Sequence, residues 1–172
     1  MPEVTVALRA LHPGQQRLRQ QLQAVRFLVV MCGRRWGKTA FGVTEACDRL
    51  LSGQRVGWFA PTYKYAQEAW REIVARLRPV CRTVSEQEKR LELLTGGVLE
   101  VWTLDTPDPA RGRWYHLAII DEAGLVRDLD GVFWSAIRPT LTDKRGCALL
   151  LGTPKGRSHG FSQLFARGEG VG

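Results

Sequence analysis

The chain has 172 residues, of which 44% are hydrophobic and 24% are charged. These proportions describe an ordinary globular protein, and the length suffices for a sizeable core without disulfide or metal staples. Lysine and arginine outnumber aspartate and glutamate by 25 to 17, which gives a net charge of +8. Such an excess favours a nucleotide or nucleic-acid partner, although solubility alone also explains it.

The sequence argues against a membrane protein and against a domain stapled by metal or disulfides. No apolar run approaches the ~20 residues of a membrane span, and the N-terminus lacks the apolar region of a secretory signal. We therefore expect a cytosolic protein with no membrane partner. The four cysteines are far apart and the three histidines do not cluster, so we expect reduced thiols and no zinc site.

Residues 1–25 predict a turn followed by an amphipathic helix. Leu-His-Pro-Gly at 11–14 is turn chemistry, and leucines then recur at helical spacing. Gln15 precedes an apolar strand, where a glutamine amide could read the edge of an adenine through its donors and acceptors. A solvated position on the helix surface is the more frequent explanation of such a glutamine.

The stretch from Arg26 to Thr39 has the order strand, loop, helix. An apolar run rich in valine and leucine stops at a loop of small residues and arginines, which ends in Gly-Lys-Thr at 37–39. This order is typical of a phosphate-binding loop, whose backbone N–H groups and helix dipole attract phosphate. Lys38 would then reach the terminal phosphates, and Thr39 would place its hydroxyl on Mg²⁺.

One position of this loop departs from the usual pattern. Cys32 stands six residues before the lysine, where a glycine is normal, and Gly33 follows it. The alternative is therefore a glycine-rich strand-to-helix turn with an ordinary surface lysine. The motifs that follow the loop distinguish a phosphate-binding loop from an ordinary turn.

Helix and strand patterns alternate through the middle of the chain. Apolar residues recur at helical spacing after the lysine, and a second amphipathic helix ends at Pro79. Thr-Gly-Gly at 95–97 is a hairpin signal. The predicted elements are a helix at 38–52, a strand at 55–60, a helix at 65–77, and strands at 81–85, 90–94 and 98–102.

A pair of carboxylates follows the next apolar strand, at 117–120. Asp121 and Glu122 would lie at the carboxyl edge of a buried sheet, where α/β folds collect their ligands. There Asp121 can hold Mg²⁺, and Glu122 can orient or deprotonate an attacking water. An Asp-Glu helix cap is the alternative, but the lysine loop upstream favours the catalytic interpretation.

The last third of the chain predicts one more helix, interrupted at Pro139, and a buried strand at 147–151. Thr153 follows that strand and can sense a γ-phosphate, although Gly-Thr-Pro is equally good as a loop. A short helix near 161–166 closes the core, which we place at 26–166. The patterns together predict a single P-loop α/β domain with a mostly parallel central sheet flanked by helices.

Five motifs in order resemble the ATPase domain of the large terminase subunit of tailed bacteriophages, the motor that packages DNA. They cover residues 11 to about 165, and their specificity lies in their order. The motifs are Leu-His-Pro-Gly-Gln at 11–15, Cys-Gly-Arg-Arg-Trp-Gly-Lys-Thr at 32–39, Ala-Pro-Thr-Tyr at 60–63, Arg-Gly at 111–112 ahead of Ile-Ile-Asp-Glu-Ala at 119–123, and Leu-Gly-Thr-Pro-Lys-Gly at 151–156.

The resemblance implies a P-loop NTPase of the additional-strand, catalytic-glutamate type and gives several residues a role. Gln15 matches the family's adenine-contacting glutamine, with Gln16 a rival. Arg34 matches an arginine of the family's deviant loop, and Arg111 matches a finger that reaches the ATP of a neighbouring subunit. Thr153 falls in the motif that couples γ-phosphate loss to movement. The loop residues expected at the nucleotide are Gly33, Arg34, Arg35, Trp36, Gly37, Lys38 and Thr39.

The resemblance also implies a function and its partners. The implied function is Mg²⁺-dependent ATP hydrolysis that drives double-stranded DNA into a procapsid. The motor would be a homo-oligomeric ring, a pentamer in the family, at the portal vertex in the host cytoplasm. The portal protein and the small terminase subunit would be further partners. The family's lid and nuclease domain are absent from this chain, so we expect no nuclease activity from it.

Two other functions fit the same residues. A helicase-like or repair ATPase would use the same loop and carboxylates, and single-stranded nucleic acid would stimulate it. A nucleotide-gated binding module would hold ATP or DNA without turnover, and in that protein Glu122→Gln would change nothing.

Overall fold

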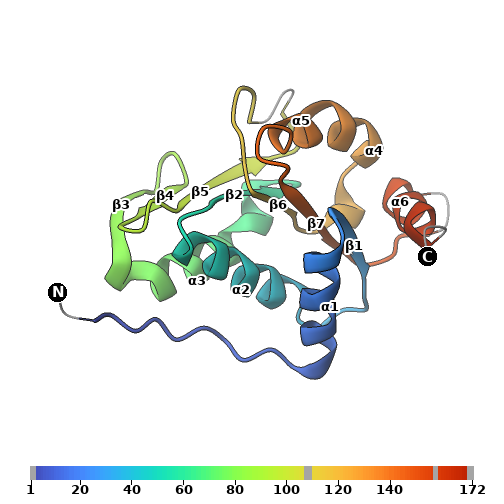
Figure 1. Ribbon diagram of the computed structural model, residues 1–172. Helices are drawn as coiled ribbons and strands as arrows, with labels where there is room; N and C mark the ends of the chain where they lie inside the picture. The colour runs from blue at the N-terminus through green and yellow to red at the C-terminus, as the bar shows by residue number, and fades with distance from the viewer. Residues whose placement is uncertain (1–2, 107–109, 157–158, 170–172) are drawn as a thin grey trace.

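The computed structural model describes residues 3–106, 110–156 and 159–169. A seven-stranded sheet lies between two groups of helices, with α1, α2 and α3 on one face and α4, α5 and α6 on the other (Figure 1). Among these residues no helix has the length and apolarity needed to cross a membrane. The strands are β1 (Phe27–Met31), β2 (Arg55–Ala60), β3 (Cys81–Ser85), β4 (Arg90–Leu93), β5 (Val98–Thr103), β6 (Leu117–Ile120) and β7 (Cys147–Gly152). The α-helices are α1 (Pro13–Ala24), α2 (Lys38–Leu51), α3 (Tyr63–Leu77), α4 (Leu129–Val132), α5 (Arg138–Thr140) and α6 (Gly160–Glu169), with 3₁₀ turns η1 (Arg78–Val80) and η2 (Ala123–Leu125) and a π-helical turn η3 (Phe133–Ile137).

The strands follow the order β1-β7-β6-β2-β5-β4-β3. The first five in this order pair in parallel, and β5, β4 and β3 are joined by antiparallel pairing. The α/β fold with a mostly parallel sheet is therefore confirmed. Crossovers bring β1 and β6, far apart in the sequence, to the two sides of β7, and this placement forms the site described below.

Each face of the sheet has its own hydrophobic core. Strand residues alternate between the faces, so Trp58 packs with α2 and α3 while its neighbour Phe59 packs on the opposite side. β6 is buried along its whole length, as expected for a central strand covered on both faces. The rigid strands thus hold their carboxyl ends at fixed positions.

The segment before α1 is extended and runs past α2 and α3 (Figure 1). Leu8 and Leu11 pack against the core on that face, and the Ala7 carbonyl accepts a hydrogen bond from Arg76 Nη1 at 3.4 Å. His12 caps α1, because its Nδ1 accepts from the backbone N–H groups of Gly14 and Gln15. The N-terminal segment is therefore part of the packed fold.

The helix expected to be interrupted at Pro139 takes a different form. A continuous helical run passes from α4 through the π-helical η3 into α5, which ends one residue after the proline. Pro139 is the second residue of α5, which follows the π-helical turn directly. The change of helix type absorbs the proline without breaking the run.

The turn between β4 and β5 packs closely on α2 at Gly97. A Cβ atom at Gly97 would collide with the backbone carbonyl of Leu50, which lies in the last turn of α2. We expect Gly97→Ala to lower the free energy of unfolding in urea by about 2 kcal/mol, as overpacking typically does.

The adjacent glycine supplies the control. Gly96 has φ +89° and nothing lies within 4 Å of its Cβ position. Because asparagine tolerates the left-handed conformation, Gly96→Asn should leave stability nearly unchanged. Equal losses in both variants would contradict the packing argument.

Candidate functional site

Three strand ends meet at one edge of the sheet. β7 pairs in parallel with β1 through Met31 and Gly152 and with β6 through Leu150 and Ile120. The chain leaves these strands at the loop 32–37, at Thr153 and at Asp121, and the Cys32 N–H donates to the Gly152 carbonyl at 3.2 Å. Parallel pairing therefore gathers the predicted loop, the predicted sensor and the predicted carboxylate at the same edge.

The loop between β1 and α2 turns sharply at two residues. Arg35 has φ 62° and Gly37 has φ 91°, and a Cβ on Gly37 would approach Gln15 Nε2 to 2.9 Å. Gly37 is also the N-cap of α2, so the first N–H groups and the positive end of the helix dipole face the loop. This is the geometry that binds phosphate.

Lys38 is folded back over the loop and only 8% exposed. Its Nζ donates to the carbonyl oxygens of Cys32 at 3.0 Å and Gly33 at 2.7 Å. The ammonium therefore lies inside the curve of the loop, where a phosphate oxygen would compete with these carbonyls for its protons. Desolvation raises the pKa of the Cys32 thiol, which favours a neutral thiol beside this lysine.

Thr39 and Asp121 meet across the sheet edge. The Thr39 hydroxyl donates to the Asp121 carboxylate, with Oγ1 at 3.1 Å from Oδ2 and 3.3 Å from Oδ1. A hydroxyl and a carboxylate in contact are the two protein ligands that Mg²⁺ takes in P-loop proteins. Among the described residues, no group of three histidine, cysteine, aspartate or glutamate side chains is placed to hold a metal, here or elsewhere.

Asp121 is 2% exposed, and burial raises its pKa to about 6. Hydrogen bonds from the Glu122 N–H and the Thr39 hydroxyl oppose this shift, and so does the charge of Lys38. The carboxylate is therefore ionised at neutral pH but at a cost in stability. A bound cation at this position would remove that cost.

Glu122 follows in an uncommon backbone conformation. Its φ is 50°, in the left-handed region, and its N–H donates to Asp121 Oδ1 at 3.0 Å. The side chain is partly exposed, so water can reach it. Behind it, a Cβ on Gly124 would lie 2.5 Å from the Thr153 carbonyl, so the chain can follow this path only with glycine there. Strain of this kind is typical of functional sites.

Gln15 faces the loop through contacts that neither periodicity nor motif spacing predicted. Its Nε2 donates to the Gly37 carbonyl at 3.1 Å, and its Oε1 accepts from the His12 N–H at 3.2 Å. The His12 ring meets the Trp36 ring edge-on at 4.9 Å. His12 was not among the predicted site residues, although it belongs to the Leu-His-Pro-Gly-Gln motif at 11–15. α1 is therefore tied directly to the phosphate-binding loop.

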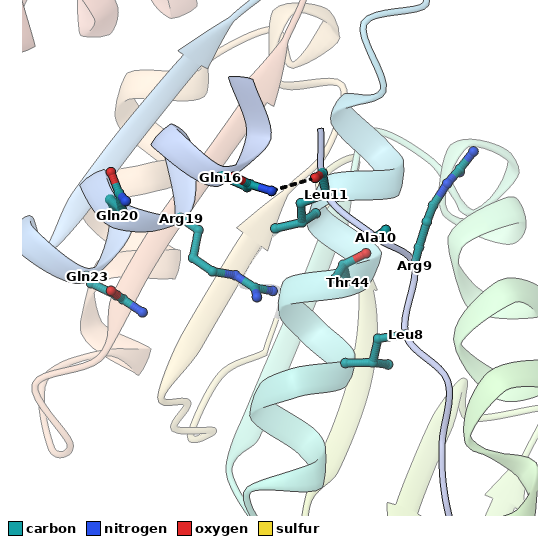
Figure 2. Close-up of a pocket in the computed structure, with 9 residues that line it drawn as sticks. All are labelled: Leu8, Arg9, Ala10, Leu11, Gln16, Arg19, Gln20, Gln23 and Thr44. Atoms are coloured by element: carbon teal, nitrogen blue, oxygen red, sulfur yellow. Dashed lines mark hydrogen bonds between the residues drawn. The ribbon is translucent and has the colours of Figure 1, made fainter. Parts of the chain in front are cut away.

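Gln16 points elsewhere. Its Nε2 donates to the Leu11 carbonyl at 3.0 Å, beside a hollow of about 530 Å³ between α1, the preceding segment and α2 (Figure 2). Arg19 also lines this hollow and pairs with the buried Glu45 of α2, with Nε 2.6 Å from Oε1. The structure thus separates the two glutamines, with Gln15 at the loop and Gln16 at this hollow.

The two predicted arginines lie in different places. Arg34 is exposed on the phosphate-binding loop itself. Arg111 lies in an exposed turn whose neighbours are η3 and α5, where it lines a hollow of about 390 Å³ with Ser135 and Pro139. That hollow shares no residue with the loop at 32–39, so Arg111 is not gathered with the other predicted residues.

The sheet order, the loop after β1 and the buried carboxylate after β6, with β7 between these strands, define a P-loop NTPase-like α/β domain. Comparison with known proteins then identifies relatives: the chain is homologous to the large terminase subunits of phages, which confirms the resemblance. No protein-family model matches it.

The large terminase subunit of Escherichia phage T5 is 31% identical over 148 residues, which cover 83% of this chain and 33% of that protein. The large terminase subunit of Thermus phage G20c is 34% identical over 164 residues, with 81% and 33% covered. The chain therefore spans about a third of the length of the curated relatives it matches. A mutant ATPase domain of the Thermus phage P74-26 large terminase has the same fold, with a TM-score of 0.78, 24% identity and coverage of 91% of this chain and 70% of that one.

The raised pKa of Asp121 gives a pH test on the metal-free protein. The pKa of Asp121 is about 6 in the folded protein and near 3.8 in the unfolded chain. The protonated carboxyl therefore contributes most to folding stability below pH 3.8, and this contribution is lost as the pH rises through 6. Asp121→Asn should therefore raise the free energy of unfolding at neutral pH, by on the order of 2 kcal/mol.

Urea unfolding across this pH range, with a chelator present, measures the effect. The gain should vanish as the pH falls below 3.8. Asp143→Asn removes an exposed aspartate and should show no such pH-dependent gain. A difference between Asp121→Asn and the wild type that stays constant with pH would contradict the assignment.

Proposed function

We propose that this domain binds ATP with Mg²⁺ and hydrolyses it. The observation that carries the proposal is the hydrogen bond of the Thr39 hydroxyl to the buried Asp121 carboxylate, at the mouth of a loop that also encloses Lys38. These groups match what the triphosphate and its metal require, namely backbone N–H donors, one ammonium, one hydroxyl and one carboxylate.

Each residue has a distinct task in this proposal. Lys38 binds the terminal phosphates, and Thr39 and Asp121 hold Mg²⁺, whose charge offsets that of the phosphate oxygens. Glu122 accepts a proton from the attacking water and directs it, which its partial exposure permits. Arg34 adds positive charge from the loop. The residues proposed to contact the nucleotide through backbone or side chain are Gln15, Gly33, Arg34, Arg35, Trp36, Gly37, Lys38, Thr39 and Thr153.

We infer that hydrolysis drives translocation of double-stranded DNA during phage packaging, because the relatives are named large terminase subunits and the fold is that of a terminase ATPase domain. DNA contacts would go mainly to phosphates and would weaken with salt. The motor would be a homo-oligomeric ring in the host cytoplasm at the portal vertex of the procapsid, with the portal protein and the small subunit as partners. In such a ring Arg111 acts on the ATP of a neighbour, in keeping with the hollow that it lines, which shares no residue with its own loop.

The catalytic carboxylate is tested by Glu122→Gln. We expect ATP affinity within about twofold of the wild type but hydrolysis lower by roughly 10²–10⁴, because the amide accepts no proton from water. Isothermal titration with Mg-ATP and a phosphate-release assay, with and without linear duplex DNA, measure the two effects. Lys38→Ala is the comparison, and it should lose binding as well as turnover.

The same assays separate the alternatives. ATP binding without turnover in the wild type, together with identical behaviour of Glu122→Gln, would indicate a nucleotide-binding module. Stimulation by single-stranded DNA but not by duplex would indicate a helicase-like ATPase. Either result would contradict the packaging proposal.

The trans role of Arg111 is tested by mixing variants. Arg111→Ala should lower turnover by roughly 10³-fold or more, as loss of an arginine finger does. Mixed with Lys38→Ala, it should regain part of the activity at high protein concentration, because one variant supplies intact sites and the other intact fingers. Recovery that is absent at every protein concentration would argue against a finger in trans.

A further inference from the structure

We propose that Glu100 is a positioning residue, which holds the turn at 110–113 so that Arg111 is presented in a fixed place. The proposal rests on the role proposed above for Arg111. Glu100 lies on β5, two strands from the predicted site, and is only 3% exposed. A carboxylate so deeply buried needs a reason, because burial of an unpaired charge is strongly unfavourable.

The four partners of Glu100 come from three parts of the chain, namely β2, β4 and the segment that follows Arg111. Oε2 accepts a hydrogen bond from the Tyr115 hydroxyl at 2.7 Å and lies 3.4 Å from Arg55 Nη2 on β2. Oε1 lies 3.5 Å from Arg90 Nε on β4 and 3.8 Å from Arg113 Nε. Two of these partners, Arg113 and Tyr115, come two and four residues after Arg111 in the chain.

Tyr115 is the tighter of the two links. Its ring lies over Gly57, where a Cβ atom would approach the ring to 2.8 Å, and its hydroxyl accepts from Trp102 Nε1 at 2.7 Å. Burial and then the Glu100 carboxylate raise the pKa of Tyr115, so the phenol stays protonated and remains a donor. The Tyr115 N–H also donates to the Thr140 carbonyl at 2.8 Å. Both the hydroxyl and the backbone N–H of Tyr115 are therefore held by hydrogen bonds.

The turn itself is narrow. Ala110 is buried with φ 58°, Gly112 has φ 74°, and the Arg113 N–H donates to the Ala110 carbonyl at 3.0 Å. Arg111 stands between them, exposed at the tip. Ala110 is held in a left-handed conformation that costs free energy, and such a conformation persists only when its surroundings impose it. The anchor at Arg113 and Tyr115 supplies that constraint on one side.

An arginine finger has to arrive at a neighbouring active site with its position already set. A misplacement of about 1 Å can cost on the order of a hundredfold in rate. The links from Glu100 to Tyr115 and Arg113 fix the turn to β2, β4 and β5, which are rigid parts of the sheet. Glu100 would thus act through Arg111 without touching the nucleotide.

The test variant is Glu100→Gln, which keeps the shape and removes the charge. The glutamine amide has one acceptor oxygen and one donor NH₂ group. Whichever way the amide is turned, the NH₂ group replaces an acceptor oxygen, either the one that bonds Tyr115 or the one that pairs with Arg90 and Arg113. The matched control is Glu92→Gln, which removes a partly exposed carboxylate that also pairs with Arg90, at 3.2 Å, but does not contact the turn. Tyr115→Phe tests the same link without altering a charge.

Amide hydrogen exchange measures how firmly Glu100 holds the segment at Arg113 and Tyr115. We expect the amides of Arg113 and Tyr115 to exchange roughly tenfold faster in Glu100→Gln than in Glu92→Gln, while the amides of β6 are unchanged. Tyr115→Phe should shift the Arg113 amide in the same direction by a smaller factor. Exchange in the turn equal to that of Glu92→Gln would overturn the proposal, whatever the ATPase assays show.

Mixing experiments then separate positioning from general damage. Glu100→Gln should fail to restore turnover to Arg111→Ala, because it donates poor fingers, yet should restore turnover to Lys38→Ala, because its own site is intact. A merely structural defect would lower both mixtures alike, and full rescue of Arg111→Ala would overturn the proposal. If Lys38→Ala and Arg111→Ala do not complement each other, the trans finger itself fails, and the exchange data still decide whether Glu100 holds the turn.

Discussion

The site depends on the parallel pairing of β1 and β6 with β7, which lies between them. The phosphate-binding loop, Thr153 and Asp121 come from distant parts of the chain, and only this pairing puts their strand ends at one edge. The bond from the Thr39 hydroxyl to Asp121 then spans the edge above β7. Because β6 and β7 are buried and β1 pairs with β7 along its whole length, the strand ends cannot shift independently, and the loop and the carboxylate keep their spacing.

Much of the fold could be predicted from the sequence because the strands that lead into the site are short apolar runs. Such runs end where the chain meets the ligand edge, so the residues just after them, Lys38 and Thr39 after one strand and Asp121 after another, could be named from order alone. The mostly parallel sheet followed from the alternation of strand and helix. Thr39 and Asp121 are in contact as this argument expects, although their chemical roles stay predictions.

Contacts between side chains distant in sequence were not readable. Neither the packing of His12 on Trp36 nor the bond from Gln15 to the Gly37 carbonyl follows from periodicity or motif spacing. Glu100 resembled an ordinary polar residue of a hairpin strand, and its burial among arginines depends on strands that meet only in the folded sheet. The π-helical η3 likewise reflects local packing, since propensity indicates only a helix near a proline.

The same strand pairing has a consequence for how the protein is made. The register pairs Phe27 with Ala148, so β1 gains its sheet partner only after Ala148 has been synthesised. Closing so long a loop is slow compared with forming local helices or the β3–β4 hairpin. During synthesis on the ribosome, the phosphate-binding loop therefore remains unsupported while α2, α3 and the hairpin can already form. A nucleotide bound at this loop would therefore stabilise the domain only after β1 has paired with β7.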